Sequence, residues 1–385
     1  MNYSFKKVFV AACFGMLSFG MVMITIGSLL PELMNKFEMG SIAAGVLTSL
    51  LPVGILSGSL LFGPIADRYG YKWLMIISAL LEAIGVIGVG LGEKIIVVQF
   101  SVFLIGFGGG VINGAANSLV ADISEKNKGA NLSLLGVFYG VGALGMPFLL
   151  AVLSGVFNFS TILLSVGVFI FCIVLFYLSI SFPVSKQPQG FPLKDGLKIV
   201  RNPILLFCGL SAFFASSVEG VMNNWLTSFF SINNMGTKSE GLYFLTFMVL
   251  ALTVMRVVLG GLLKKFNPFS VMIFLTVFLL IGFGFLFTGL KMYTLIGVIF
   301  IGIGTAANFP VLLGYIAELF PKLSATAFSV VFTMALTGNT ISNYGMGHIS
   351  EIWSVKALPI FGSILSLLMI GMMFMFKSSA FKKKG

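Results

Sequence analysis

Apolar residues are gathered in long runs that are separated by short polar connections. About 20 apolar residues in a helix are enough to cross the roughly 30 Å hydrocarbon core of a bilayer. Runs of that length can be placed twelve times, so the pattern predicts an all-α membrane protein with twelve transmembrane helices. The predicted spans are residues 8–30, 41–62, 73–91, 95–121, 131–153, 159–182, 203–230, 241–263, 269–290, 293–317, 323–346 and 357–377.

The longest polar connection, residues 183–202, is rich in proline and basic residues and separates six predicted helices from six more. We therefore predict an N-terminal bundle over residues 1–182, a cytoplasmic linker over 183–202 and a C-terminal bundle over 203–385. Two landmarks recur in both halves at nearly equal offsets, which favours two related repeats. The landmarks are the glycine turns at Gly63 and Gly260, and the helix segments from Gly106 to Asp122 and from Gly302 to Glu318.

Composition supports a membrane protein independently of the runs. The chain is 58% hydrophobic and 9% charged, with mean hydropathy +1.08, whereas soluble domains carry roughly 25% charged residues. The net charge of +11 could suggest a nucleic-acid partner. The positive residues, however, lie in the connections between apolar runs, so we interpret them as a topology signal and expect the lipid bilayer, not nucleic acid, as the partner.

The orientation follows from the lysines and arginines. With the N-terminus placed inside, most of the 23 basic residues fall at cytoplasmic ends of helices, as the positive-inside rule requires. Both termini are therefore predicted to be cytoplasmic, in the cell membrane. The first apolar run, 8–30, is too long for the core of a signal peptide and is interpreted as a retained helix.

Enzymatic chemistry has no recognisable sequence signal. The three cysteines all lie in apolar runs and are interpreted as core residues with no disulfide or metal role. There is no phosphate loop, metal-ligand cluster or nucleophile–base pairing at a familiar spacing, so we predict no enzyme, no cofactor and no metal. Without a nucleotide site, energy must come from gradients, and one charge crossing 100 mV yields about 2.3 kcal/mol.

A charged turn bounded by glycines joins the second and third predicted helices and reads GPIADRYGYK over residues 63–72. Gly63 and Gly70 permit backbone geometry and close approach that a side chain would block. Asp67 can accept hydrogen bonds at the start of the next helix, and Arg68 and Lys72 add positive charge. We expect these five residues to act in gating. A solvated turn that only sets topology is the alternative.

Ion pairs between helix ends are the expected latches of such a gate, made in one state and broken in another. Exposed ion pairs contribute little, so a latch matters only where closure removes water from it. The expected residues are Arg68 with Asp122 in the first half, and Lys264 and Lys265 with Glu318, together with Arg256, in the second.

The turn pattern G-x-x-A-D-R-x-G-x-K resembles the cytoplasmic signature between helices 2 and 3 of the major facilitator superfamily, and the chain resembles that superfamily from end to end. The resemblance implies two six-helix bundles around a central cavity lined by helices 1, 4, 7 and 10, working by alternating access. Arg256 begins Arg-x-x-x-Gly, which also resembles a superfamily pattern, and is interpreted as a structural or gating residue.

Two acidic residues lie inside predicted spans, where an ionisable group is costly and is a functional candidate by default. Glu82 lies near the middle of the third predicted helix, and Glu219 lies in the outer half of the seventh. Either could hold a proton near neutral pH and release it when water or a cation arrives, so both are candidates for proton coupling. A neutral acid bonded to a neighbouring helix is the alternative for each.

Amide and aromatic side chains form a second set of polar residues within the spans. Asn side chains both donate and accept hydrogen bonds, so a site of amides with one or two aromatic rings suits a polyhydroxyl ligand. Helix-to-helix hydrogen bonding is the alternative. The substrate-binding candidates are Asn113, Asn117, Tyr139, Asn223, Asn224, Trp225, Asn308, Asn339 and Asn343.

Within the superfamily, several stretches resemble the fucose–proton symporters and related sugar carriers: GSLLPEL at 27–33, NGAANS at 113–118, FYGVGAL at 138–144, and Glu219 six residues before Trp225. Those symporters use an acid in the middle of helix 1 and another on helix 4 just before Ala-Ala-Asn. Here the first helix has no acid and the second position is Asn113. If coupling exists, Glu219 or Glu82 must carry it, or the protein is a uniporter.

Three functions remain open from the sequence. The first is proton-coupled import of a small polar solute such as a sugar, by a carrier that we expect to be a monomer. The second is proton-driven efflux of amphipathic drugs or metabolites, which a cavity rich in the 20 Met and 41 Phe residues would favour. The third is a non-transporting sensor on the same fold.

Overall fold

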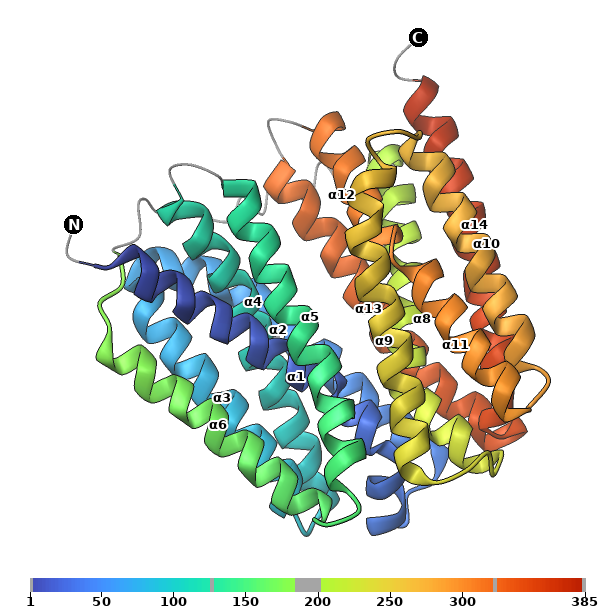
Figure 1. Ribbon diagram of the computed structural model, residues 1–385. Coiled ribbons are helices and arrows are strands. Elements are labelled where there is room, and N and C mark those ends of the chain that lie inside the picture. The colour runs from blue at the N-terminus through green and yellow to red at the C-terminus, as the bar shows by residue number, and fades with distance from the viewer. Residues whose placement is uncertain (1–2, 125–127, 184–201, 321–323, 383–385) are drawn as a thin grey trace. The chain divides into compact units, whose positions relative to one another are not determined.

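The computed structural model describes residues 3–124, 128–183, 202–320 and 324–382, without the side chains of residues 63–69, 128–130, 133, 317, 324–326 and 380–382. Every regular element in these ranges is a helix (Figure 1). The prediction of an all-α protein is therefore confirmed. The helices are α1 (Phe5–Lys36), α2 (Ser41–Tyr69), α3 (Tyr71–Leu91), α4 (Ile95–Ile123), α5 (Lys128–Leu153), α6 (Phe159–Ser179), α8 (Pro203–Ile232), α9 (Lys238–Leu262), α10 (Pro268–Leu286), α11 (Lys291–Thr305), α12 (Asn308–Leu319), α13 (Ser324–Trp353), the 3-10 helix η1 (Val355–Ala357) and α14 (Leu358–Lys382).

Eleven of these segments are long and apolar enough to cross a membrane. The twelfth, α13, has 30 residues but is more polar, because Asn339, Asn343 and several hydroxyl residues interrupt its apolar sequence. With α11 and α12 counted as one broken span, the described helices match the twelve predicted spans.

The predicted span 293–317 corresponds to one candidate membrane span, Lys291–Ile316, but its helix is interrupted. Helix α11 ends at Thr305, and α12 begins at Asn308 after a turn at Ala306 and Ala307. Pro310 explains the break: it has no N–H to donate, and its ring would clash with the carbonyl group four residues earlier, at Ala306.

The predicted turn over residues 63–72 is mostly helical, which corrects the sequence-based boundaries. Helix α2 continues to Tyr69 and α3 begins at Tyr71, so Gly70 alone separates them. Gly70 has φ 76°, a value that only glycine adopts readily. The side chains of Asp67 and Arg68 lie outside the described residues, as does the surrounding space at Gly63, so their predicted gating roles stay predictions.

The chain divides into two compact units by its internal contacts. The first comprises residues 1–38 and 50–191, and the second comprises 39–49 and 192–385. The start of α2 therefore groups with the second unit, and the rest of α2 with the first. Residues 184–201 lie outside the described part, so the bundle boundaries drawn at the 183–202 linker stay a prediction.

In the first unit, helices pack closely where glycines face a neighbouring backbone. A methyl group added to Gly20 of α1 would collide with the carbonyl of Tyr139 on α5, and one added to Gly142 of α5 would collide with the carbonyl of Leu17 on α1. Helix α4 meets α3 in the same way, since a methyl group on Gly108 would lie 2.5 Å from the carbonyl oxygen of Ser78. Small residues at such crossings let membrane helices approach closely.

In the second unit, α8 packs against both α13 and α14. The first turns of α2 also belong to this unit and lie along the end of α13. A methyl group on Gly45 would lie 2.9 Å from the Cα of Gly347. The Ser49 hydroxyl donates to the Thr340 carbonyl at 3.0 Å, and the backbone N–H of Ser41 donates to the Glu351 carboxylate at 3.1 Å.

Candidate functional site

One network of polar side chains joins α8 to α13 in the second unit. We call it the amide network, and its members are Ser216, Asn224 and Trp225 on α8 and Asn339 and Asn343 on α13. The two asparagines of α13 are four residues apart, which places them on one face of the helix. Trp225 and Asn343 are fully buried, so their polar atoms depend on protein partners.

Asn343 lies at the centre of the amide network. Its Oδ1 accepts hydrogen bonds from Asn224 Nδ2 at 3.1 Å and from Trp225 Nε1 at 3.2 Å. Its Nδ2 donates to Asn339 Oδ1 at 2.7 Å and to the Asn339 carbonyl at 2.9 Å. Every hydrogen-bonding atom of the Asn343 side chain is thereby occupied.

The amide network weakens at Asn339. This side chain is half-buried, and its Nδ2 lies 3.5 Å from the Ser216 hydroxyl oxygen, the longest bond in the network. It packs directly on the backbone of Gly220, where a methyl group would collide with the amide. Asn339 is therefore the member whose hydrogen bonds a hydroxyl-bearing ligand could replace at the lowest cost.

Asn223 and Glu219 do not take part in the amide network. Both are half-buried and lie four residues apart on α8, so they share a face that differs from the face of Trp225. No hydrogen bond to the Glu219 carboxylate is found among the described residues. The predicted cluster Asn223–Asn224–Trp225 is therefore split, because consecutive helical residues point about 100° apart.

The first unit carries its own polar face on α4. Asn117 Nδ2 donates to the Asn113 carbonyl at 2.8 Å and to Asn113 Oδ1 at 3.1 Å, and it lies 4.0 Å from the Met16 sulfur on α1. Both asparagines are half-buried. The predicted pair at i and i+4 is thus brought together. Tyr139 of α5 packs against Phe19 of α1, with ring centroids 5.5 Å apart.

Glu82 of α3 has a different environment. Its side chain is 0% exposed, and neither carboxyl oxygen has a hydrogen-bond partner among the described residues. A methyl group on Gly109 of α4 would lie 3.3 Å from Glu82 Oε1 and 2.7 Å from Cδ2 of Phe19. The carboxyl group therefore lies between α3, α4 and α1, against a glycine and an aromatic ring.

Asn308 is placed apart from the amide network by its contacts. It lies at the start of α12, is buried, and its Oδ1 accepts a hydrogen bond from the Thr276 hydroxyl of α10 at 3.4 Å. This contact joins two helices, which agrees with helix-to-helix hydrogen bonding, the alternative to ligand binding.

The predicted gating residues differ in whether their side chains have hydrogen-bond or ion-pair partners. Lys72 donates to the Leu178 carbonyl at 3.1 Å, and Asp122 accepts a hydrogen bond from the Tyr71 hydroxyl at 2.7 Å. The Nε of Arg256 is buried without a partner in the described part of the chain. No ion pair joins Glu318 to Lys264 or Lys265 within the described residues, so the second latch is not made there.

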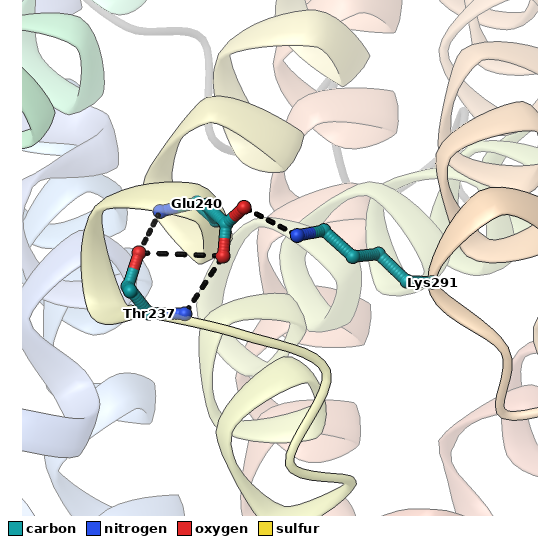
Figure 2. A network of polar contacts seen from close by, with 3 residues as sticks. All are labelled: Thr237, Glu240 and Lys291. Carbon is teal, nitrogen blue, oxygen red and sulfur yellow. Dashed lines mark hydrogen bonds and ion pairs between the residues drawn. The ribbon is translucent and has the colours of Figure 1, made fainter.

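The sequence reasoning missed an exposed network at the start of α9. Figure 2 shows Thr237, Glu240 and Lys291 joined by hydrogen bonds and an ion pair. Thr237 and Glu240 form a capping box, with the Glu240 carboxylate accepting from the Thr237 N–H at 2.8 Å. The Thr-x-x-Glu spacing was a readable signal. Because both charged side chains are exposed, the contact between α9 and α11 contributes little stability.

Helices long and apolar enough to cross a membrane, with buried amides and a buried acid between them, are typical of a polytopic membrane protein. The chain belongs to the major facilitator superfamily: the family model described as Major Facilitator Superfamily matches residues 9–293. It is therefore a multi-pass membrane protein that moves small molecules, and membership of a transporter family confirms that it is not an enzyme.

Similar proteins of known name differ in what they move. The glucose/mannose transporter GlcP of Bacillus subtilis is 23% identical over 353 residues, which are 88% of this chain and 85% of the relative. The multi-drug resistance efflux pump PmrA of Streptococcus pneumoniae is 28% identical over 181 residues, which are 46% of this chain and 44% of the relative. The superfamily prediction is confirmed, and sugar carriers are among the relatives.

Solved structures confirm the fold. The D-xylose–proton symporter has TM-score 0.79 and 14% identity, covering 94% of this chain and 97% of that one. The nucleoside transporter NupG has TM-score 0.77 and 14% identity, covering 97% and 98%. A bacterial homolog of the human lysosomal transporter Spinster has TM-score 0.82 and 13% identity, covering 97% and 96%. At these identities the likeness concerns the fold alone.

Proposed function

We propose that the protein is a secondary active transporter that carries a small polar solute, of the sugar class, across the cell membrane by alternating access. The observation that carries this proposal is the amide network. In it, the indole of Trp225 and three amide side chains lie together where α8 and α13 meet. Amides donate and accept equally well, so they match a ligand with many hydroxyl groups. Relatives named for glucose and mannose support the same class.

Within this proposal each unit supplies its own set of solute-binding residues. In the second unit, Asn339 offers the half-buried amide, while Asn343, Asn224 and Trp225 hold it in place. In the first unit, the α4 amides offer polar groups, and the aromatic pair on α1 and α5 offers flat surfaces. The proposed solute-binding set comprises residues that would contact the solute and residues that hold those in place: Asn113, Asn117, Tyr139, Asn223, Asn224, Trp225, Asn308, Asn339 and Asn343.

We propose that protons drive the transport, with Glu82 and Glu219 as the acids that could carry them. An unpaired acid buried inside a membrane helix is expensive and is a candidate for function. The gating residues at the ends of α2, α3, α4, α9 and α12 would respond to the change of state. The basic connections favour cytoplasmic termini, and we propose that the carrier works as a monomer.

Proton-driven efflux of amphipathic compounds is the second candidate. One relative is named as a multi-drug efflux pump, over about half of this chain. A methionine and an aromatic pair lie beside the α4 amides, since the Met16 sulfur approaches Asn117 and Phe19 packs on Tyr139. Apolar, polarizable side chains of this kind suit binding of varied compounds.

One set of proteoliposomes tests both candidates. Uptake of labelled D-glucose, D-xylose and uridine is measured with an imposed pH gradient, and efflux of ethidium is measured in the same vesicles. We expect accumulation of at least one hydroxyl-rich solute, with slower uptake at low solute concentration in Asn339→Ala and unchanged uptake in Asn35→Ala, an exposed asparagine near the end of α1. Ethidium efflux without uptake of any of the three solutes would instead establish the second candidate.

A further inference from the structure

The Glu82 carboxyl group is the one buried acid of the first unit that has no partner in the part of the chain described. We call its surroundings the carboxyl cluster, formed by Ser18 and Phe19 of α1, Glu82 of α3, and Gly108 and Gly109 of α4. A methyl group on Gly108 would lie 3.0 Å from Glu82 Cγ. The close approach of α4 therefore encloses the carboxyl group and keeps water away from it.

The surroundings favour a neutral acid and a proton as its ligand. A carboxylate buried without a hydrogen bond or a cation is strongly disfavoured, whereas the protonated acid is tolerated. The titratable group that interacts with it among the described residues is Tyr177 of α6, which supplies no positive charge. Metal cations need several oxygen ligands, but a phenyl ring and two glycines line this cluster.

Ser18 can respond to the charge of this acid. Its hydroxyl is near enough to interact with the Glu82 carboxyl group, but it makes no hydrogen bond to that group and donates its hydrogen to the Gly15 carbonyl at 2.9 Å instead. When Glu82 is ionised, rotation of the hydroxyl would turn that hydrogen toward the carboxylate. When Glu82 takes a proton from water, the Ser18 hydroxyl returns to the Gly15 carbonyl, which is the arrangement that the structure has.

Phe19 connects this acid to the polar face of the first unit. One side of its ring lies against Gly109, next to Glu82 Oε1, and the ring also packs on Tyr139, with centroids 5.5 Å apart. A change at Glu82 that moves α1 at Ser18 must move Phe19, because the two residues are consecutive. Tyr139 is the residue that receives this movement.

We propose that Glu82, and not Glu219, is the proton-carrying residue, and that Phe19 transmits its charge state to Tyr139. This assignment rests on the proposed proton-driven transport and names the site and the route of coupling within it. Glu82 binds one proton from water on one side of the membrane and releases it to water on the other. Phe19 is a positioning residue. Its ring contacts Tyr139 and the other members of the carboxyl cluster, but it carries no proton itself.

Infrared difference spectroscopy of the purified full-length protein tests the site without any solute. At neutral pH we expect the C=O stretching band of a protonated carboxylic acid, which shifts in D₂O, disappears at alkaline pH and is absent in Glu82→Gln. A band that is unchanged in Glu82→Gln, that is lost in Glu219→Gln instead, or that persists at every pH would overturn the assignment. Sodium ions that abolish the band at neutral pH would also overturn it, in favour of a metal cation.

The same spectra test the route through Phe19. A tyrosine ring band, identified by its loss in Tyr139→Phe, should shift as Glu82 is titrated. The shift should vanish in Phe19→Leu, while the Glu82 band remains. The matched control is Phe14→Leu, also on α1 but paired with Phe176 of α6, which should retain both signals. A Tyr139 shift that survives in Phe19→Leu would refute the route. Absence of solute flux would refute the proposed function but leave these spectral results intact.

Discussion

Two sets of buried polar groups, one in each unit, differ in whether their hydrogen-bonding atoms have partners. In the second unit, Asn343 has every hydrogen-bonding atom paired with Asn224, Trp225 or Asn339. In the first unit, Glu82 is equally buried but its oxygens have no partner in the described residues. Paired amides stabilise a fixed arrangement of helices, whereas an unpaired buried acid is costly and is a candidate for function.

The largest effect on stability is expected from a substitution that breaks the amide network. Asn343→Leu leaves the indole N–H of Trp225 and the amide N–H of Asn224 buried without an acceptor. Each such group costs about 1–3 kcal/mol, so we expect the free energy of unfolding in detergent to fall by about 3 kcal/mol. Denaturant unfolding followed by Trp fluorescence measures this change. Asn35→Ala, at an exposed position, should have no measurable effect, and equal effects of the two changes would contradict the network's role.

The second prediction has the opposite sign. Glu82→Met replaces an unpaired buried acid with an adaptable apolar side chain of similar length. Because no hydrogen bond is lost, we expect the free energy of unfolding to stay the same or to rise by about 1 kcal/mol. The same denaturant titration measures it. A loss of more than about 2 kcal/mol would show that Glu82 has structural partners. It would then not differ from the paired amides of the second unit.

A smaller effect on stability is expected at the edge of the amide network. Asn339→Ala removes the bond to Ser216 and the bond from the Asn343 amide to Asn339 Oδ1, but the Asn343 amide still donates to the backbone carbonyl of residue 339 and so keeps an acceptor. We expect a cost of about 1 kcal/mol in stability. If Asn339 binds the solute, the KM for transport should rise about tenfold, equivalent to about 1.4 kcal/mol. A stability loss as large as that of Asn343→Leu, with KM unchanged, would make Asn339 purely structural.

The smallest effect is expected at the exposed network of Figure 2. Glu240 and Lys291 form an ion pair with both side chains in contact with solvent. Glu240→Gln, Lys291→Met and the double variant should give a coupling energy below about 1 kcal/mol that decreases as salt is added. Transport should be unaffected. A coupling energy that is insensitive to salt would indicate a dehydrated pair, unlike its exposure in the structure.

Most of the fold could be predicted from the sequence, because eleven of the spans are apolar runs long enough to cross a membrane. The prediction failed where a single residue decides a local conformation. Pro310 breaks the span between α11 and α12, and Gly70 alone forms the connection between α2 and α3. The grouping of residues 39–49 with the second unit depends on contacts far apart in the chain, for which the local pattern carries no signal.

Only part of the candidate site could be predicted from the sequence. The sequence named Asn113, Asn117, Asn339 and Asn343 as candidates, and the i, i+4 spacing of Asn113 and Asn117 places these two on one face of a helix. It could not show that Asn343 would accept from Trp225, because that requires knowing which faces of α8 and α13 meet. Likewise, Glu82 and Glu219 appear equivalent in the sequence, and only their surroundings separate a buried acid from a half-buried one.

The central claim, that Glu82 carries the coupling proton, is tested most directly by comparing accumulation with counterflow in proteoliposomes for the hydroxyl-rich solute that the uptake screen identifies. A one-unit pH gradient can drive about tenfold accumulation at one proton per solute. We predict that Glu82→Gln loses this accumulation but retains counterflow, whereas Glu93→Gln, at an exposed acid, retains both. Accumulation that survives in Glu82→Gln, or that is lost only in Glu219→Gln, would contradict the claim.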